Sequence, residues 1–177
     1  YCRVKRFVPV DQAGEVKKLK LAGVWLSPTW LRNYPHDGLM CHVLGFVNWA
    51  GDKCGGIEQQ FDHYLRGRDG LLVSEKDGQR RELYSRRRLH IEPQLGADVI
   101  LTLDANVQYM VEEALDDLME EHQAVGAWAI VQQVRTGEIL AMASRPAFDP
   151  NQFRYADPDQ RRNRAVTHLY EPGSTFK

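Results

Sequence analysis

The sequence contains no apolar run near the ~20 residues that a membrane-spanning helix requires. It also lacks an excess of either charge, because 23 Lys and Arg stand against 24 Asp and Glu, for a formal net charge of -1. No global field therefore favours nucleic acid or an anionic membrane surface. With 43% hydrophobic residues in 177 positions, the chain can bury a core, which excludes disordered and collagen-like classes.

The sequence has only three cysteines, and their spacing matches no known cysteine motif. Cys2, Cys41 and Cys54 form no C-x-x-C pair, and any disulfide scheme leaves one of them over. They predict neither a disulfide-stapled scaffold nor a zinc site, and they favour plain buried or free thiols.

Histidines and arginine runs also lack a binding pattern. The sequence has no H-E-x-x-H motif, so we expect surface or satisfied core histidines at His36, His42 and His63. The arginine runs at 86–88 and 161–162 have no interleaved aromatics to stack nucleic-acid bases, and predict solvated links.

The first fifty residues predict one helix and two strands. Residues 11–21 have the spacing of a short amphipathic helix, with Asp11 placed to cap it. Residues 21–26 resemble a strand, and the run at 40–47 is apolar and rich in strand formers.

A second helix and a hairpin are expected next. Residues 56–65 place their apolar side chains on one helical face, and Gly67 is in a position to close that helix. The dipeptide Asp77-Gly78 favours a two-residue turn between strands at 71–73 and 82–84.

The polar segment at 86–93, which contains Pro93, is the best candidate for a domain boundary. It predicts two modules, residues 1–95 and residues 96–177. The second module opens with a strand-like run at 99–103, after which Asp104 can cap a helix.

The clearest helix follows Asp104. Its apolar residues recur at steps of three and four: Val107, Met110, Val111, Ala114, Leu115 and Leu118. Acidic residues mostly fill the other face and predict a solvated surface rather than a metal site: Glu112, Glu113, Asp116, Asp117, Glu120 and Glu121. Strand-like runs at 127–134 and 138–144 flank residues 135–137, which predicts a hairpin with Gly137 at positive φ.

The last four residues, Ser174-Thr175-Phe176-Lys177, have the form S-x-x-K. Residues three apart share a helical face, so a neutral Lys177 amine could take the Ser174 proton as the hydroxyl attacks a carbonyl. A lysine at its reference pKa of ~10.4 is charged at pH 7, so this chemistry requires an enclosed site. Glu171-Pro172-Gly173 suits a turn that starts a helix, where the Ser174 N–H could help hold an oxyanion.

S-x-x-K alone is a weak motif, but its context is specific. The string Y-E-P-G-S-T-F-K at 170–177 resembles the active-site segment of class B penicillin-binding proteins, and R-N-R-A at 162–165 resembles the element that precedes it. T-G-E-I-L-A-M-A-S-R-P at 136–146 is similar to the opening hairpin of that family. Further similar segments are F-D-P-N at 148–151, L-T-L-D at 101–104 with Gln108, H-V-L-G-F at 42–46, G-G-I-E at 55–58 and L-R-G-R-D-G at 65–70.

The resemblance implies an α+β fold, with a small pedestal (dimerisation-like) lobe followed by the N-terminal part of an α/β serine transpeptidase domain. It implies a peptidoglycan D,D-transpeptidase whose Ser174 forms an acyl-serine with D-Ala-D-Ala stem peptides and captures β-lactams. No metal or organic cofactor is implied. E-P-G-S-T-F-K at 171–177 is closer to septum-type than to elongation-type members, and Arg162 and Arg164 would support the approach to the site.

The same resemblance implies partners and a location. A polytopic glycan polymerase and division proteins would dock on residues 1 to 95, and the domain would face the periplasm or cell exterior from the bacterial cytoplasmic membrane. The chain begins at Tyr1, which predicts a piece of a longer protein without its single-pass anchor. The family's S-x-N and K-T-G elements would lie after Lys177 and do not occur here, so we expect the isolated chain to be inactive.

Two alternatives differ in class. The string S-T-F-K also occurs in serine β-lactamases and β-lactam sensors, which lack a pedestal module and reach their serine after fewer residues. A non-catalytic scaffold in the divisome is the second alternative, and it is compatible with a catalytic parent. Labelling by a fluorescent penicillin separates a catalytic protein from a scaffold.

Overall fold

The computed structural model describes residues 2–29, 31–79 and 81–175, and it divides into two compact units, residues 1–34 and 35–177. The first unit contains helix α1 (Val10–Lys18), in which the Ala13 N–H donates to the Pro9 carbonyl. The helix begins at Val10, with Pro9 in the N-cap position, so Asp11 lies inside the first turn and does not cap the helix as predicted. The predicted strand at 21–26 is absent; this segment is a turn followed by irregular chain.

The second unit opens with helix α2 (Cys41–Leu44), strand β1 (Phe46–Val47) and strand β2 (Lys53–Cys54), which pairs antiparallel with β1. The predicted strand at 40–47 is therefore mostly wrong. Met40 (φ 60°) and Gly45 (φ 76°) both adopt positive φ and enclose a single helical turn. That turn directs Cys41 and His42 into the core, which outweighs the strand preference of the side chains.

Two helices follow in place of the single one predicted, α3 (Gly56–Gln60) and α4 (Asp62–Leu65), with a break at Phe61. Gly56 is required, because a Cβ there would lie 2.2 Å from the Val43 carbonyl oxygen. Gly67 does not close α4 as predicted. It lets residues 68 and 94 pair as a β-bridge, since a Cβ at Gly67 would lie 2.4 Å from the Gln94 oxygen.

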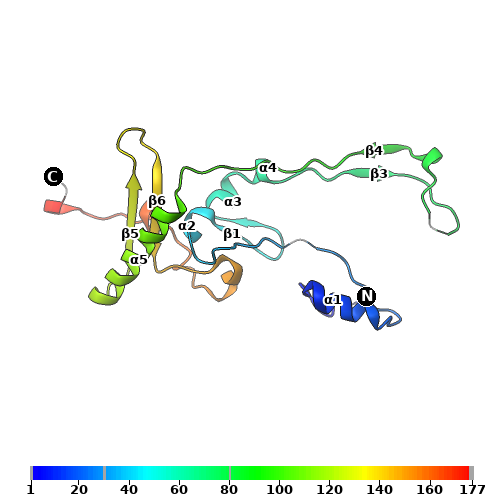
Figure 1. Cartoon of the computed structure of the whole chain (residues 1–177), viewed down its shortest axis with the longest axis horizontal. Coiled ribbons are helices and arrows are strands. Elements are labelled where there is room, and N and C mark those ends of the chain that lie inside the picture. The colour runs from blue at the N-terminus through cyan, green and yellow to red at the C-terminus, as the bar shows by residue number, and fades with distance from the viewer. Residues whose placement is uncertain (1, 30, 80, 176–177) are drawn as a thin grey trace. The chain divides into compact units, whose positions relative to one another are not determined.

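Strand β3 (Leu71–Val73) pairs antiparallel with β4 (Leu89–Ile91), side by side in Figure 1. The chain does reverse near Asp77-Gly78, but not in the predicted two-residue turn: a longer loop lies between the bridge partners Lys76 and Glu82, and Asp77 Oδ1 accepts from the Gln79 and Arg81 N–H groups in it. The predicted partner strand at 82–84 is wrong, because only the bridge between Lys76 and Glu82 forms there. A 3-10 turn, η1 (Tyr84–Arg86), follows. Strand β4 then lies within the segment at 86–93 that was predicted to be a connection.

Helix α5 (Ala105–His122) begins as predicted, with the Asp104 carboxylate accepting from the Asn106 and Val107 N–H groups. The segment at 99–103 is not a strand. It runs beside β6, to which the Thr102 hydroxyl donates at Ile139 (2.7 Å) and the Asp104 N–H at Leu140 (2.9 Å).

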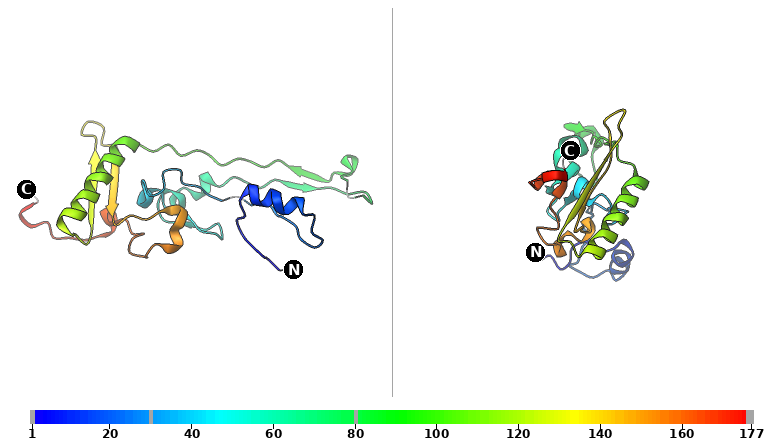
Figure 2. Two further views of the ribbon diagram at one scale, coloured as in Figure 1. Left: turned by 60° about the horizontal axis from the view of Figure 1, so that its bottom comes forward. Right: turned by 90° about the vertical axis from the view of Figure 1, so that its left-hand side faces the viewer.

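The hairpin of β5 (Ala127–Gln132) and β6 (Ile139–Arg145) is confirmed, with Gly137 at φ 80° in its turn. Figure 2 shows α5 packed along these strands. The remaining elements are η2 (Pro150–Tyr155), α6 (Arg164–Thr167) and η3 (Gly173–Thr175). The fold is a mixed α and β structure, as predicted.

An aromatic cluster joins the first strand pair of this unit to the chain after β6. The ring of Phe46 stacks on Phe153 (centroids 4.8 Å apart) and meets the edge of Phe148 (5.8 Å), which also contacts His42 (5.6 Å). Phe46 and Phe148 are each 7% exposed, so they form a core with the buried Ala141 and Ala143 of β6. Burial of such rings contributes about 1.5 to 3 kcal/mol each.

No helix in the described part of the chain is long and apolar enough to cross a membrane.

Candidate active site

Ser174, the predicted nucleophile, lies in η3 and is exposed. Gly173 before it adopts φ 55°, a left-handed conformation that favours glycine and turns the chain into η3. Lys177, the predicted base, lies outside the described residues. The structure thus describes the approach to the motif and the backbone of its first two residues.

Helix α6 begins the approach to Ser174. The Asn163 side chain caps it by accepting from the Ala165 N–H (3.2 Å), and the Ser144 hydroxyl of β6 accepts from the Arg164 N–H (3.3 Å). After α6 the chain passes Trp128 of β5, whose ring lies 5.7 Å from that of His168 and 6.1 Å from that of Tyr170. The hairpin therefore carries the segment that leads to Ser174.

Arg164, the first residue of α6, anchors this helix. The residue is 7% exposed, and its guanidinium pairs with Asp159. A Cβ on Gly126 would lie 2.6 Å from Arg164 Nη1, so glycine at this position leaves room for the guanidinium. Arg162, the other predicted support, is exposed.

Beneath the hairpin lies a buried polar network that the sequence patterns did not predict. Gln108 of α5 is fully buried; its amide oxygen accepts from the Met142 N–H (2.8 Å) and its amide nitrogen donates to the Met142 carbonyl (3.0 Å). One side-chain amide therefore satisfies both backbone groups of a β6 residue on the edge that faces away from β5.

Arg145, the last residue of β6, is the cation of this network. It donates to Asp116 through Nε (2.5 Å) and Nη2 (2.7 Å), and to Glu112 Oε2 through Nη2 (3.2 Å). Burial by itself would lower the pKa of Arg145, but the hydrogen bonds and charges of Asp116 and Glu112 outweigh it and raise the pKa above its ordinary value. The guanidinium is therefore charged near pH 7.

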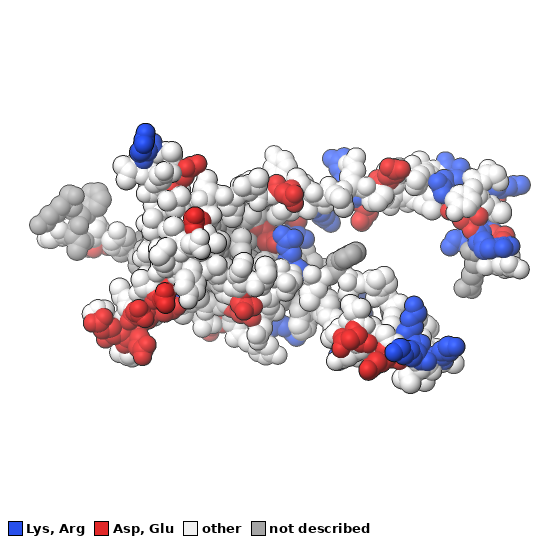
Figure 3. Space-filling model, in the orientation of Figure 1, with Lys and Arg blue, Asp and Glu red and all other residues white. Residues whose placement is uncertain are grey.

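The predicted faces of α5 need correction. Met110 and Leu118, assigned to the apolar face, are 58% and 40% exposed, while Glu112, assigned to the solvated face, is 8% exposed. The buried stripe runs through Gln108, Glu112 and Leu115, because the β6 backbone and Arg145 offer partners for polar groups there. The four-residue spacing of Gln108, Glu112 and Asp116 is the sequence signal that could have indicated this stripe. Other acidic residues of α5 do gather on the surface (Figure 3): Glu113, Asp117, Glu120 and Glu121.

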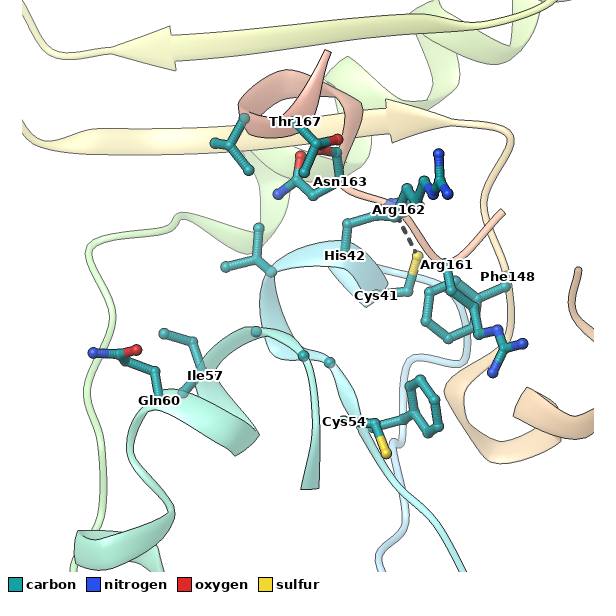
Figure 4. Close-up of a pocket in the computed structure, with 16 residues that line it drawn as sticks. Cys41, His42, Cys54, Ile57, Gln60, Phe148, Arg161, Arg162, Asn163 and Thr167 are labelled. Carbon is teal, nitrogen blue, oxygen red and sulfur yellow. Dashed lines mark hydrogen bonds between the residues drawn. The ribbon is translucent and has the colours of Figure 1, made fainter. Parts of the chain in front are cut away.

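A hollow of about 420 Å³ lies between α2 and α6. Figure 4 shows Cys41 and His42 on one side of it and Asn163 and Thr167 on the other. His42 Nε2 lies 2.8 Å from the Gln160 carbonyl oxygen. A carbonyl can only accept, so Nε2 carries the proton, and Nδ1 accepts from the Cys41 thiol (3.3 Å).

The Cys41–His42 pair is structural rather than nucleophilic. Burial raises the pKa of the Cys41 thiol to about 11, and burial lowers the pKa of His42, so both groups are neutral near pH 7. The prediction of a satisfied core histidine is confirmed for His42, and all three cysteines are free, as predicted. Within the described ranges, no group of three or more His, Cys, Asp or Glu side chains is arranged to hold a metal ion.

We expect His42 to make stability sensitive to acid. Its folded pKa lies below its ordinary value of 6.5, so the unfolded chain binds the extra proton first as pH falls through that value. The contribution of His42 to the free energy of unfolding should therefore be greatest above pH 6.5 and decrease below that pH. Urea unfolding between pH 8 and pH 5 measures this dependence.

Two histidine variants make the acid measurement specific. H42Q should have a smaller loss of stability between pH 8 and pH 5, because its amide can still donate to the Gln160 carbonyl but does not titrate. H36Q, at an exposed position, should retain the whole dependence. An unchanged acid loss in H42Q would assign the effect to another group.

Two known protein domains match this chain. A model of the penicillin-binding protein dimerisation domain matches residues 2–101, and one of the penicillin-binding protein transpeptidase domain matches residues 127–177. The chain is 41% identical to the probable peptidoglycan D,D-transpeptidase PenA of Neisseria gonorrhoeae, over 98% of this chain and 30% of that protein. It is 33% identical to the peptidoglycan D,D-transpeptidase FtsI of Escherichia coli K12, over 97% of this chain and 29% of that protein.

A solved structure of a peptidoglycan synthetase from Bifidobacterium adolescentis is similar with a TM-score of 0.69 at 30% identity, over 94% of this chain and 30% of that one. The chain thus spans less than a third of the length of these relatives. Two domain models together cover most of its residues, and their order agrees with the order of its motifs. The chain therefore belongs to the class B penicillin-binding proteins.

Proposed function

We propose that the protein containing these residues is a peptidoglycan D,D-transpeptidase of cell-wall synthesis, with a septal role. Ser174 is its nucleophile and Lys177 its general base. The observation that carries the proposal is the placement of Ser174 in η3, directly after a segment that α6 and Trp128 hold against the β5–β6 hairpin. The names of PenA and FtsI support the same reaction.

The reaction follows from the residues at the end of the chain. The Ser174 hydroxyl attacks the carbonyl between the two terminal D-alanines of a stem peptide, and its proton passes to the neutral Lys177 amine. The peptide bond breaks, the terminal D-alanine leaves with a proton, and an acyl-serine ester remains. An amine from a neighbouring strand then attacks the ester, forms the cross-link and releases Ser174.

Local backbone geometry favours this attack. A residue near the start of a helical turn has an N–H without an intrahelical partner, so the Ser174 N–H would donate to the oxyanion. β-Lactams present a strained amide of similar shape to the same hydroxyl, so they acylate Ser174 as well. S-x-N and K-T-G elements of the remaining transpeptidase domain would complete the site.

We infer a division of labour between residues 1–95 and residues 96–177. The first module is a pedestal that docks a polytopic glycan polymerase and division proteins. The second begins the transpeptidase domain, which faces the periplasm or cell exterior from the bacterial cytoplasmic membrane. The order of the two matched domain models supports this arrangement.

Labelling with a fluorescent penicillin tests the proposal. The full-length protein should become covalently labelled, and mass spectrometry of its peptides should locate the adduct on Ser174. The isolated 177-residue chain should remain unlabelled, because the S-x-N and K-T-G elements do not occur in it. An adduct on another residue of the full-length protein would overturn the assignment.

A further inference from the structure

The Glu112 carboxylate joins two parts of the chain that are distant in sequence. Its Oε1 accepts from the Met40 N–H (2.9 Å) and from the Gln108 amide (2.7 Å), while Oε2 accepts from Arg145 (3.2 Å). Met40 lies in the stretch matched by the dimerisation-domain model, and Arg145 in the stretch matched by the transpeptidase model. Glu112 lies between the two matched stretches and is 8% exposed.

Met40 depends on this carboxylate. The residue has φ 60°, and its neighbours form local bonds, with the Leu39 N–H donating to His36 and the Cys41 N–H to Gly38. The Met40 N–H is instead directed at Glu112, across 72 residues of sequence. A partly buried N–H that loses its acceptor destabilises the conformation that holds it.

The network continues from Glu112 towards Ser174. Gln108, bonded to Glu112, holds both backbone groups of Met142 on β6. Two residues further along β6, the Ser144 hydroxyl accepts from the first N–H of α6. The chain from α6 then leads along Trp128 to η3.

We propose that Glu112 is a positioning residue through which the segment around Met40 sets the position of β6 and α6, and thereby the reactivity of Ser174. Glu112 does not touch the substrate. Its kinetic consequence rests on the proposed function, whereas its structural consequence at Met40 does not. A conformational change in the segment around Met40 would therefore alter the position of Ser174 through the Glu112 carboxylate.

The test uses the full-length protein labelled with 15N-methionine. Met40 and Met142 report the two sides of the network, and Met119, in the last turn of α5, is an internal reference. In E112A, amide hydrogen exchange at Met40 should accelerate at least about tenfold relative to Met119, because the N–H has lost its acceptor. E113Q changes an exposed neighbour and should leave all these rates unchanged.

Acylation kinetics with a penicillin provide the second readout. The first-order acylation constant of E112A should fall about tenfold to a hundredfold through misplacement of Ser174, with the affinity of the non-covalent complex within about twofold. E112Q, whose amide oxygen can still accept from Met40, should keep Met40 protected and recover part of the rate. The acylation constant of E112Q should not recover fully, because a neutral amide does not replace the carboxylate that pairs with Arg145.

The outcomes separate the two proposals. Unchanged Met40 exchange in both E112A and E112Q, or an equal effect in E113Q, would overturn the role of Glu112 whatever the kinetics. Faster Met40 exchange with a normal acylation constant would also overturn it, because the reactivity of Ser174 would then be independent of the contact between Glu112 and Met40. If the unsubstituted protein is not acylated at all, the proposed function fails, while the Met40 measurement still decides the contact.

Discussion

Replacing Ser174 by alanine in the full-length protein is expected to lower penicillin capture by more than about a thousandfold, because the variant has no hydroxyl with which to form the acyl ester. Ser174 is exposed and lies in a short turn, so alanine should not change the unfolding temperature. Covalent labelling by a fluorescent penicillin, followed over time, measures the loss. Unfolding followed by circular dichroism verifies that the variant is folded.

Ser85 offers a matched control for this experiment. It is also an exposed serine in a 3-10 turn, η1, and S85A should be labelled at the rate of the unsubstituted protein. Should S174A still capture penicillin at a normal rate, the nucleophile is another residue and the proposed mechanism is wrong.

Replacing Arg145 by methionine is expected to lower the free energy of unfolding by about 3 to 5 kcal/mol, the usual cost of breaking a buried ion pair from one side. Most of this cost comes from Glu112, whose side chain is 11% exposed and would keep a buried charge without its cation. Asp116 contributes little, because its side chain is 62% exposed and water can solvate it. Chemical denaturation of the two proteins gives the difference directly.

D116N is the control for the Arg145 experiment. It removes the exposed partner and keeps the buried one, so it should cost less than about 1 kcal/mol. R145K should fall between the two, because an ammonium group keeps the charge but cannot reach Glu112, Asp116 and the Ser144 carbonyl together. Equal losses in R145M and D116N would mean that Glu112 does not depend on Arg145.

The most reliable predictions from the sequence depended on short-range chemistry. The cap at Asp104, the helix after it and the hairpin with Gly137 in its turn are all present. Each is decided by residues within a few positions of one another, so each can be recognised from spacing alone. The recognition of the family had the same basis, because its motifs are contiguous strings.

The predictions that failed depended on distant partners. The run at 40–47 has strand-forming residues, yet positive φ at Met40 and Gly45 turns its first half into a helix. Strand β3 pairs with 89–91 rather than with 82–84, although both pairings would close a hairpin. The first outcome depends on burial of Cys41 and His42 in the core, and the second on close backbone approach, because a Cβ on Gly70 would lie 2.7 Å from the Ile91 carbonyl oxygen. The composition of a segment encodes neither of them.

The sequence by itself determined the family, the order of the two modules' motifs and the position of the S-x-x-K serine, because these depend on which residues follow one another. Only the tertiary structure decided that Glu112 is buried and bonded to Met40, Gln108 and Arg145. A carboxylate on a helix is solvated by default, and it becomes a structural anion only where folding brings a cation and free N–H donors to it from segments far away in the chain.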